Sequence, residues 1–76
     1  MRDKRIKELG FNIKVERLRQ KMSQLKLSEH VGVCMETIQK IEGGRQTPSA
    51  LVMYDIAKTL DVPMETFFKD LPDKEI

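Results

Sequence analysis

Two short segments with a helical pattern, separated by only three residues, constrain the fold of this chain more than any other feature. Residues 24–31 and 35–42 each carry apolar side chains three or four positions apart, the spacing that gathers them on one face of an α-helix. Gly32 lies between the segments, and glycine readily ends a helix because it adopts the left-handed conformation without steric cost. Two short helices joined by such a turn form either a helix-turn-helix or an αα-corner that only closes a small core.

The rest of the chain predicts further helices and no strands. Apolar spacing indicates a first helix over about residues 10–21. Ser49 is placed to cap another helix over residues 50–60, and Pro63 precedes a short fifth helix over about residues 64–69. Because no segment alternates apolar and polar residues with a period of two, we expect an all-α fold.

Length and residue counts restrict the class of protein. With 76 residues, the chain is long enough for one small domain, which we place at residues 9–69. Residues 1–8 are predicted to form a basic N-terminal arm or helix extension, and residues 70–76 a frayed tail. The lone Cys34 and the lone His30 exclude an intrachain disulfide and a Cys/His zinc site. We therefore expect a cytoplasmic protein that is not an enzyme and has no metal, cofactor, small-molecule ligand or membrane partner.

Charge is divided unevenly along the chain. Residues 1–45 contain eleven lysines and arginines against six acidic residues, whereas residues 46–76 contain three against six. The overall net charge of +2 conceals this contrast. A basic first half favours an anionic partner that approaches from one side. Nucleic acid is the commonest such partner of a small domain, although an anionic membrane or an acidic protein would also fit.

Residues spread over several of the predicted helices match a known family in register. They are Ser23, Gln24, Leu27, Val31, Gly32, Val33, Thr37, Ile38, Ile41, Glu42, Gly43, Gly44, Arg45, Pro48, Ser49, Ile56, Ala57 and Lys58. This set resembles the Cro/repressor-type, or Xre-like, helix-turn-helix family, and the similarity extends from about Leu9 to Phe68. The resemblance implies a compact five-helix bundle with a helix-turn-helix, the lambda-repressor-like DNA-binding domain. It also implies a homodimer that binds an inverted repeat in double-stranded DNA as a transcriptional repressor or activator.

The outer face of residues 35–42 is predicted to read bases, because the second helix of such a pair enters the major groove. Lys40 can donate to guanine O6 and N7, and Glu36 can accept from the amino group of cytosine. Met35 can touch thymine methyl groups, so these three residues are the favoured base contacts. The full predicted set is Met35, Glu36, Thr37, Gln39 and Lys40.

Predicted phosphate contacts flank this helix. Gln24 begins the preceding helix, where free amides and the helix dipole suit an anion, and the matching glutamine of the family binds the DNA backbone. Arg45 follows two glycines in the loop after the second helix. Lys14, Arg19 and Lys21 are further candidates. Contacts of this kind add affinity and salt dependence but carry no sequence information.

Other side chains have predicted structural roles. Arg17 and Glu42 match an arginine and a glutamate that form a partly buried ion pair in the family. Tyr54 and Phe68 exceed what one small core can absorb, so we predict them at a dimer interface. Cys34 stands where the family usually has a serine or threonine that caps the recognition helix.

A second hypothesis comes from a different class of protein. In it the chain is a protein-binding module, antitoxin-like or a docking partner, which contacts a protein through Leu25 and the fifth helix. Its basic surface would then be incidental. Salt-dependent binding to random DNA separates the two hypotheses, because a docking module lacks it.

Overall fold

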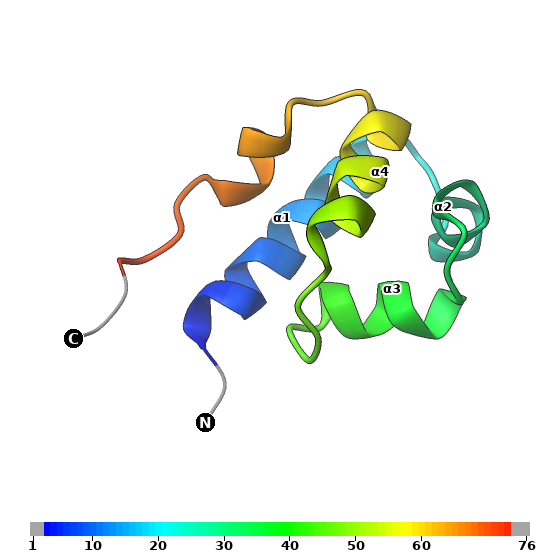
Figure 1. Cartoon of the computed structure of the whole chain (residues 1–76). Helices are drawn as coiled ribbons and strands as arrows, with labels where there is room; N and C mark the ends of the chain where they lie inside the picture. Colours follow the sequence, from blue (N-terminus) through cyan, green and yellow to red (C-terminus); the bar gives the residue numbers. More distant parts are fainter. Residues whose placement is uncertain (1–2, 74–76) are drawn as a thin grey trace.

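The computed structural model describes residues 3–73, which fold into four α-helices and one 3₁₀-helix (Figure 1). The elements are α1 (Lys4–Arg19), α2 (Gln24–Val31), α3 (Met35–Glu42), α4 (Ala50–Leu60) and the 3₁₀-helix η1 (Met64–Phe68). The described residues contain no strand, which confirms the predicted all-α class. The prediction of five α-helices is wrong, because η1 is a tight 3₁₀ turn in which the N–H of Thr66 donates to the carbonyl of Pro63.

The first helix begins at Lys4 rather than at about residue 10, and it ends at Arg19. Asp3 caps it, since its carboxylate accepts a hydrogen bond of 2.9 Å from the backbone N–H of Arg5. The guanidinium of Arg5 also donates to this carboxylate, and that hydrogen bond raises the pKa of Arg5 above its ordinary value. With this cap, the helix begins at Lys4, although residues 4–8 do not show the apolar spacing of a helix. Of the predicted frayed tail, residues 74–76 lie outside the described residues.

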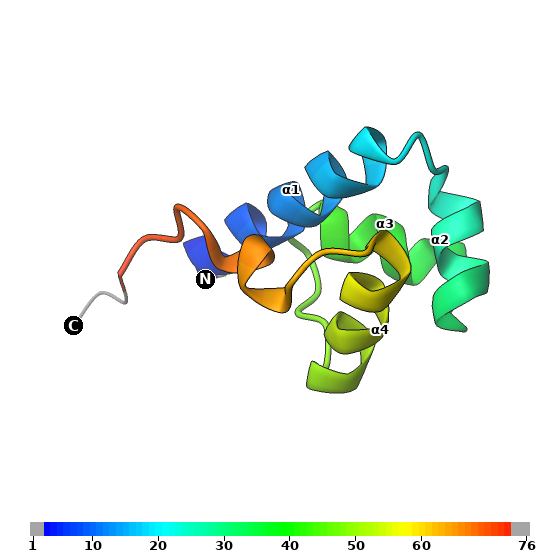
Figure 2. The ribbon, with the colours of Figure 1, turned by 90° about the horizontal axis from the view of Figure 1, so that it is seen from above.

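All the elements contribute apolar side chains to one core. Its buried members are Leu9, Ile13, Leu27, Ile38, Ile41, Met53, Ile56, Ala57, Leu60 and Phe67. Seen from above, η1 lies beside α1 and also contacts α4, so it closes one side of the bundle (Figure 2). Phe67, the inward-facing residue of η1, is fully buried. None of the helices within residues 3–73 combines the length and the apolar character needed to cross a membrane.

Two glycines allow α1 to lie directly against the end of α3 and the loop that follows. A Cβ atom on Gly10 would lie 2.0 Å from the carbonyl oxygen of Ile41 and 3.0 Å from that of Glu42. Gly44, with a φ of 74°, lies against Lys7, where a Cβ atom would come within 2.8 Å of the Lys7 Cα. The absence of side chains at these two positions therefore sets the distance between α1 and the segment that ends α3.

A buried asparagine, which the apolar pattern does not predict, ties η1 to α1. The Nδ2 atom of Asn12 donates to the carbonyl oxygen of Phe67 at 2.9 Å and to that of Lys69 at 2.8 Å. Two donors on one amide thus satisfy two backbone acceptors at the end of η1. This pairing fixes the position of a short element that has little hydrogen bonding of its own.

Candidate nucleic-acid interface

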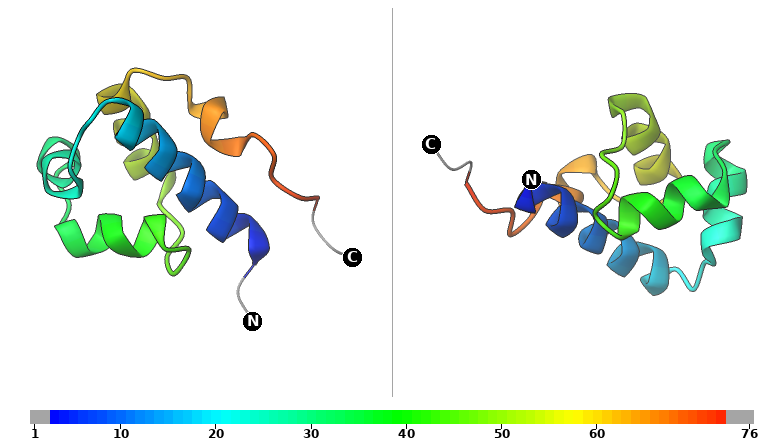
Figure 3. Two further views of the ribbon diagram at one scale, coloured as in Figure 1. Left: turned by 180° about the vertical axis from the view of Figure 1, so that it is seen from behind. Right: turned by 90° about the horizontal axis from the view of Figure 1, so that it is seen from below.

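The connection between α2 and α3 is set by local hydrogen bonds. Ser23 caps α2 by accepting a hydrogen bond of 3.0 Å from the backbone N–H of Lys26. Gly32 ends α2 with a φ of 85°, and its N–H donates to the carbonyl of Ser28 at 2.8 Å. The two helices pack against each other, and no other ribbon lies in front of α3 when the molecule is seen from below (Figure 3, right). The short turn therefore presents α3 at one edge of the molecule.

One side of α3 belongs to the core and the other faces outward. Ile38 and Ile41 are fully buried, whereas Met35 is 40% exposed. Of the predicted base contacts, the structure exposes Met35, Glu36 and Gln39 and leaves Thr37 and Lys40 half-buried. The outer side of α3 thus offers side chains with donors, acceptors and an apolar tip, the groups that can contact base edges.

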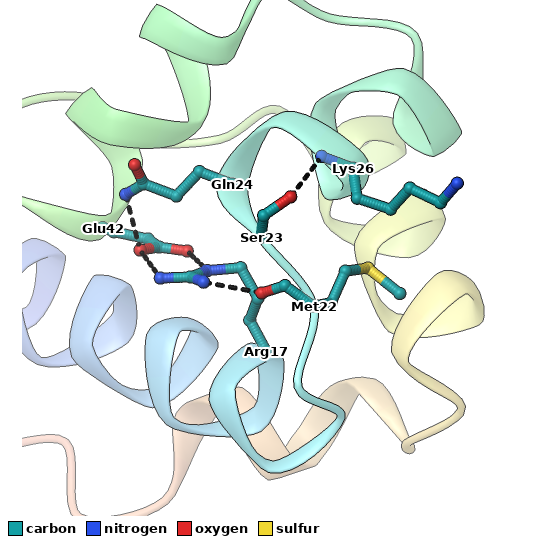
Figure 4. Close-up of polar contacts among 6 residues, drawn as sticks. All are labelled: Arg17, Met22, Ser23, Gln24, Lys26 and Glu42. Atoms are coloured by element: carbon teal, nitrogen blue, oxygen red, sulfur yellow. Dashed lines mark hydrogen bonds and ion pairs between the residues drawn. The ribbon is translucent and has the colours of Figure 1, made fainter.

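Arg17 and Glu42, which were predicted to pair, form a buried ion pair between α1 and the end of α3 (Figure 4). The Nε atom of Arg17 lies 2.7 Å from Oε2 of Glu42, and the Nη2 atom lies 3.0 Å from Oε1. The two residues are only 6% and 9% exposed. Arg17 also donates through Nη1 to the backbone carbonyl of Met22 at 2.7 Å. One guanidinium therefore connects α1, the end of α3 and the segment that enters α2.

Gln24, the predicted phosphate contact at the start of α2, has an internal partner that the sequence did not reveal. Its Nε2 atom donates to Oε1 of Glu42 at 3.0 Å (Figure 4). An amide nitrogen carries two hydrogens, so one N–H of Gln24 can still reach a second acceptor. The two residues are 18 positions apart and lie on different helices, so no local pattern relates them.

The predicted cationic contacts lie on α1, just after its end and in the loop after α3. Arg45 is exposed in the loop after α3, and this loop lies beside Lys7 near the start of α1. Arg19 and Lys21 are exposed at the other end, with Arg19 about 18 Å from Lys7 along the helix axis. Lys14 is exposed between them. The structure thus separates Arg45 from Arg19 and Lys21 and places it near Lys7, which the sequence analysis did not select.

Three further residues from the sequence analysis lie on the surface. Cys34 is a free, exposed cysteine directly before α3, and its side chain makes no capping hydrogen bond. A thiol is a weak acceptor, which explains why it does not replace the serine or threonine of the family. Tyr54 is 51% exposed and Phe68 is 44% exposed, so both aromatic rings are accessible to a partner.

Comparison with known sequences places the chain among helix-turn-helix proteins. Residues 13–67 match the family HTH_3, described as helix-turn-helix. An uncharacterized transcriptional regulator in the ATPase CF(0) region of Rhodospirillum rubrum is 41% identical over 63 residues, which are 83% of this chain and 58% of that protein. An uncharacterized HTH-type transcriptional regulator of Sinorhizobium medicae is 38% identical over 64 residues, which are 84% of this chain and 46% of that protein. The chain therefore spans about half the length of these two relatives.

A shorter relative matches over most of its length. The uncharacterized HTH-type transcriptional regulator YgzD of Bacillus subtilis is 42% identical over 57 residues, which are 72% of this chain and 86% of that protein. Because one match covers nearly the whole of a short protein and the others cover part of longer ones, the similarity is confined to a unit of about the size of this chain.

Solved structures have the same arrangement of helices. The restriction-modification controller protein C.AhdI of Aeromonas hydrophila superposes with a TM-score of 0.80 at 21% identity, over 83% of this chain and 96% of that one. PlcR of Bacillus thuringiensis, solved in complex with the peptide PapR7 and DNA, gives a TM-score of 0.77 at 29% identity. The superposition covers 88% of this chain and 24% of the PlcR chain. The family match, the relatives and the shared fold show that this chain belongs to the Xre-type helix-turn-helix family HTH_3.

Proposed function

We propose that this protein is a cytoplasmic transcriptional regulator that binds an inverted-repeat operator in double-stranded DNA as a homodimer, with α3 in the major groove. The observation that carries the proposal is the position of α3, whose inner residues Ile38 and Ile41 are buried while its outer side is uncovered. DNA-binding helix-turn-helix domains insert their second helix in this way. The names of the sequence relatives and the DNA in the PlcR complex support the proposal.

In the proposed complex, the side chains of α3 read bases and the flanking elements hold the backbone. Met35, Glu36 and Lys40 contact base edges, and Thr37 and Gln39 extend the same row. The remaining contacts are to phosphate, from the second N–H of Gln24, from Arg45, and from Lys14, Arg19 and Lys21. Glu42 holds the Gln24 amide in place before DNA arrives, which lowers the entropy lost on binding.

Selection of bound sequences from a random pool of double-stranded DNA at about 150 mM salt tests this proposal. We expect an enriched inverted repeat whose half-sites are about ten base pairs apart, because a two-fold dimer presents its two α3 helices one DNA turn apart. Bound DNA without an enriched sequence would contradict specific recognition. A folded protein that retains no DNA would contradict DNA binding itself.

Lys40→Ala and Arg45→Ala are expected to affect binding in different ways. Lys40→Ala should reduce discrimination at one base pair by about 1–3 kcal/mol, because a base-edge donor is lost. Arg45→Ala should weaken binding to selected and to random DNA by the same factor, because a phosphate contact is lost. It should also reduce the salt slope, the slope of log affinity against log salt concentration, by about one. Fluorescence anisotropy titrations over a salt series measure both quantities, with Lys69→Ala as the control on an exposed residue after η1. Equal effects of the two variants on both DNAs would refute this division of roles.

Phe68→Asp is expected to give a monomer that remains helical. The aromatic ring is 44% exposed, and a carboxylate there would have to be desolvated at the proposed dimer interface with Tyr54. Sedimentation velocity measures the association and circular dichroism the helix content. Leu18→Asp, at a residue 54% exposed on α1, is the matched control and should leave the dimer intact. A Phe68→Asp dimer as stable as the wild type would refute the interface.

The second candidate function is a protein-binding module that contacts a partner through Leu25 of α2, which is 53% exposed. An antitoxin-like or docking role would use this surface together with η1. The selection experiment decides between the candidates, because only the DNA-binding protein retains DNA with a salt dependence.

A further inference from the structure

The first turns of α1 lie against the loop that follows α3. A Cβ atom on Gly44 would lie 2.8 Å from Cα, 3.0 Å from Cβ and 3.3 Å from Cγ of Lys7. The start of α1 and this loop lie side by side both in the first view and from below (Figures 1 and 3). Because the contact joins main-chain atoms of both segments, it fixes the base of the Lys7 side chain next to the loop.

The contact brings two cationic residues to one edge of the molecule. Lys7 is exposed, and its Cβ lies beside Gly44, the residue directly before the exposed Arg45. Positive charges gathered on one edge repel each other and raise the local concentration of an anion. The flexible four-carbon stem of lysine lets its ammonium group reach an anion several ångströms beyond the backbone.

We infer that Lys7 binds a phosphate of the DNA backbone on the same side of the groove as Arg45. This inference rests on the proposed function, and it extends the proposed phosphate contacts of α1 to its first turns, beside the loop after α3. Lys7 is assigned a phosphate rather than a base because it lies beside the loop that leaves the end of α3 and not on α3 itself. The sequence pattern does not single out Lys7, because residues 1–8 carry no apolar stripe and their position relative to residue 44 depends on the packing at Gly10.

Lys7→Gln tests the inference in the full chain. Glutamine keeps the Cβ and Cγ atoms that lie beside Gly44 and removes only the charge. We expect affinity for random and for selected DNA to fall by the same factor, about three- to tenfold near 150 mM salt, and the salt slope to fall by about one. Lys7→Arg should restore both. Lys69→Gln, the same change at an exposed lysine after η1, should leave affinity and slope unchanged.

The possible results separate this inference from the function on which it rests. If the wild-type protein binds DNA and Lys7→Gln matches it in affinity and slope, the Lys7 contact is refuted while the proposed function stands. If the variant loses affinity only for the selected sequence and keeps its salt slope, Lys7 reads a base and the phosphate assignment is wrong. If the folded wild-type protein retains no DNA, the proposed function fails and the inference fails with it. Thermal unfolding of each variant, expected at the midpoint of the wild type, verifies that the changes act on binding.

Discussion

Replacing Gly10 with alanine is expected to destabilise the protein by about 3 kcal/mol or more. The new Cβ atom would meet the carbonyl oxygen of Ile41 at 2.0 Å and that of Glu42 at 3.0 Å. Both obstacles are backbone atoms in the last turn of α3, so no side-chain rotation can relieve them. The two helices would have to move apart, and this would open the core around Ile13, which is fully buried on α1. Urea and thermal unfolding followed by circular dichroism measure the loss.

Gly32→Ala is the matched control for this prediction. Gly32 has a φ of 85° and nothing within 4 Å of the position of an added Cβ atom. Its replacement therefore costs only the left-handed conformation of an L-residue, about 1–2 kcal/mol. If Gly10→Ala costs no more than Gly32→Ala, the backbones of α1 and α3 do not approach each other as closely as the structure indicates.

Arg17→Met is expected to destabilise the protein by about 3–5 kcal/mol, the usual cost of breaking a buried ion pair by removing one partner. The carboxylate of Glu42, whose side chain is 3% exposed in the wild-type protein, would keep only the amide of Gln24 as a donor. The carbonyl of Met22 would also lose its hydrogen bond from Arg17. Chemical unfolding at neutral pH measures the change.

A surface lysine on the same helix provides the control. Lys14 is exposed on α1, so Lys14→Met should change stability by no more than about 0.5 kcal/mol. Replacing both Arg17 and Glu42 with methionine removes both charges and should recover much of the loss of Arg17→Met. If Arg17→Met lowers the stability no more than Lys14→Met does, or if the double variant is less stable than Arg17→Met alone, the buried pair does not have the role described.

These two sites explain how so short a chain holds its candidate DNA surface in place. Gly10 sets how closely α1 approaches α3, and the ion pair of Arg17 and Glu42 joins the two helices. The same contacts hold Gln24 at the start of α2 and bring Lys7 beside the loop that carries Arg45. The proposed DNA contacts therefore depend on the packing of α1 even though most of them lie on other elements.

The elements that the sequence predicts best are those whose ends are set by neighbouring residues. Ser23 and Ser49 cap α2 and α4 through hydrogen bonds to backbone N–H groups three residues later, at 3.0 and 3.2 Å. Gly32 ends α2 with the positive φ that its lack of a side chain allows. Because caps and turns act over three to five residues, the sequence alone specified α2, the turn and α3, and with them the helix-turn-helix. For residues 1–8 the sequence left an arm and a helix extension open, because the cap of α1, Asp3, precedes residues without an apolar stripe.

The sequence by itself therefore determined the helices around the turn, their inner faces and the family, since each follows from local pattern or from residues in register. Only the tertiary structure decided which distant groups meet. Gln24 donates to Glu42 across 18 positions, Asn12 donates to the carbonyl of Phe67 across 55, and Lys7 lies against Gly44. The physical reason is that these partners are chosen by how helices pack, and packing depends on the combined shape and volume of the whole core rather than on any one segment.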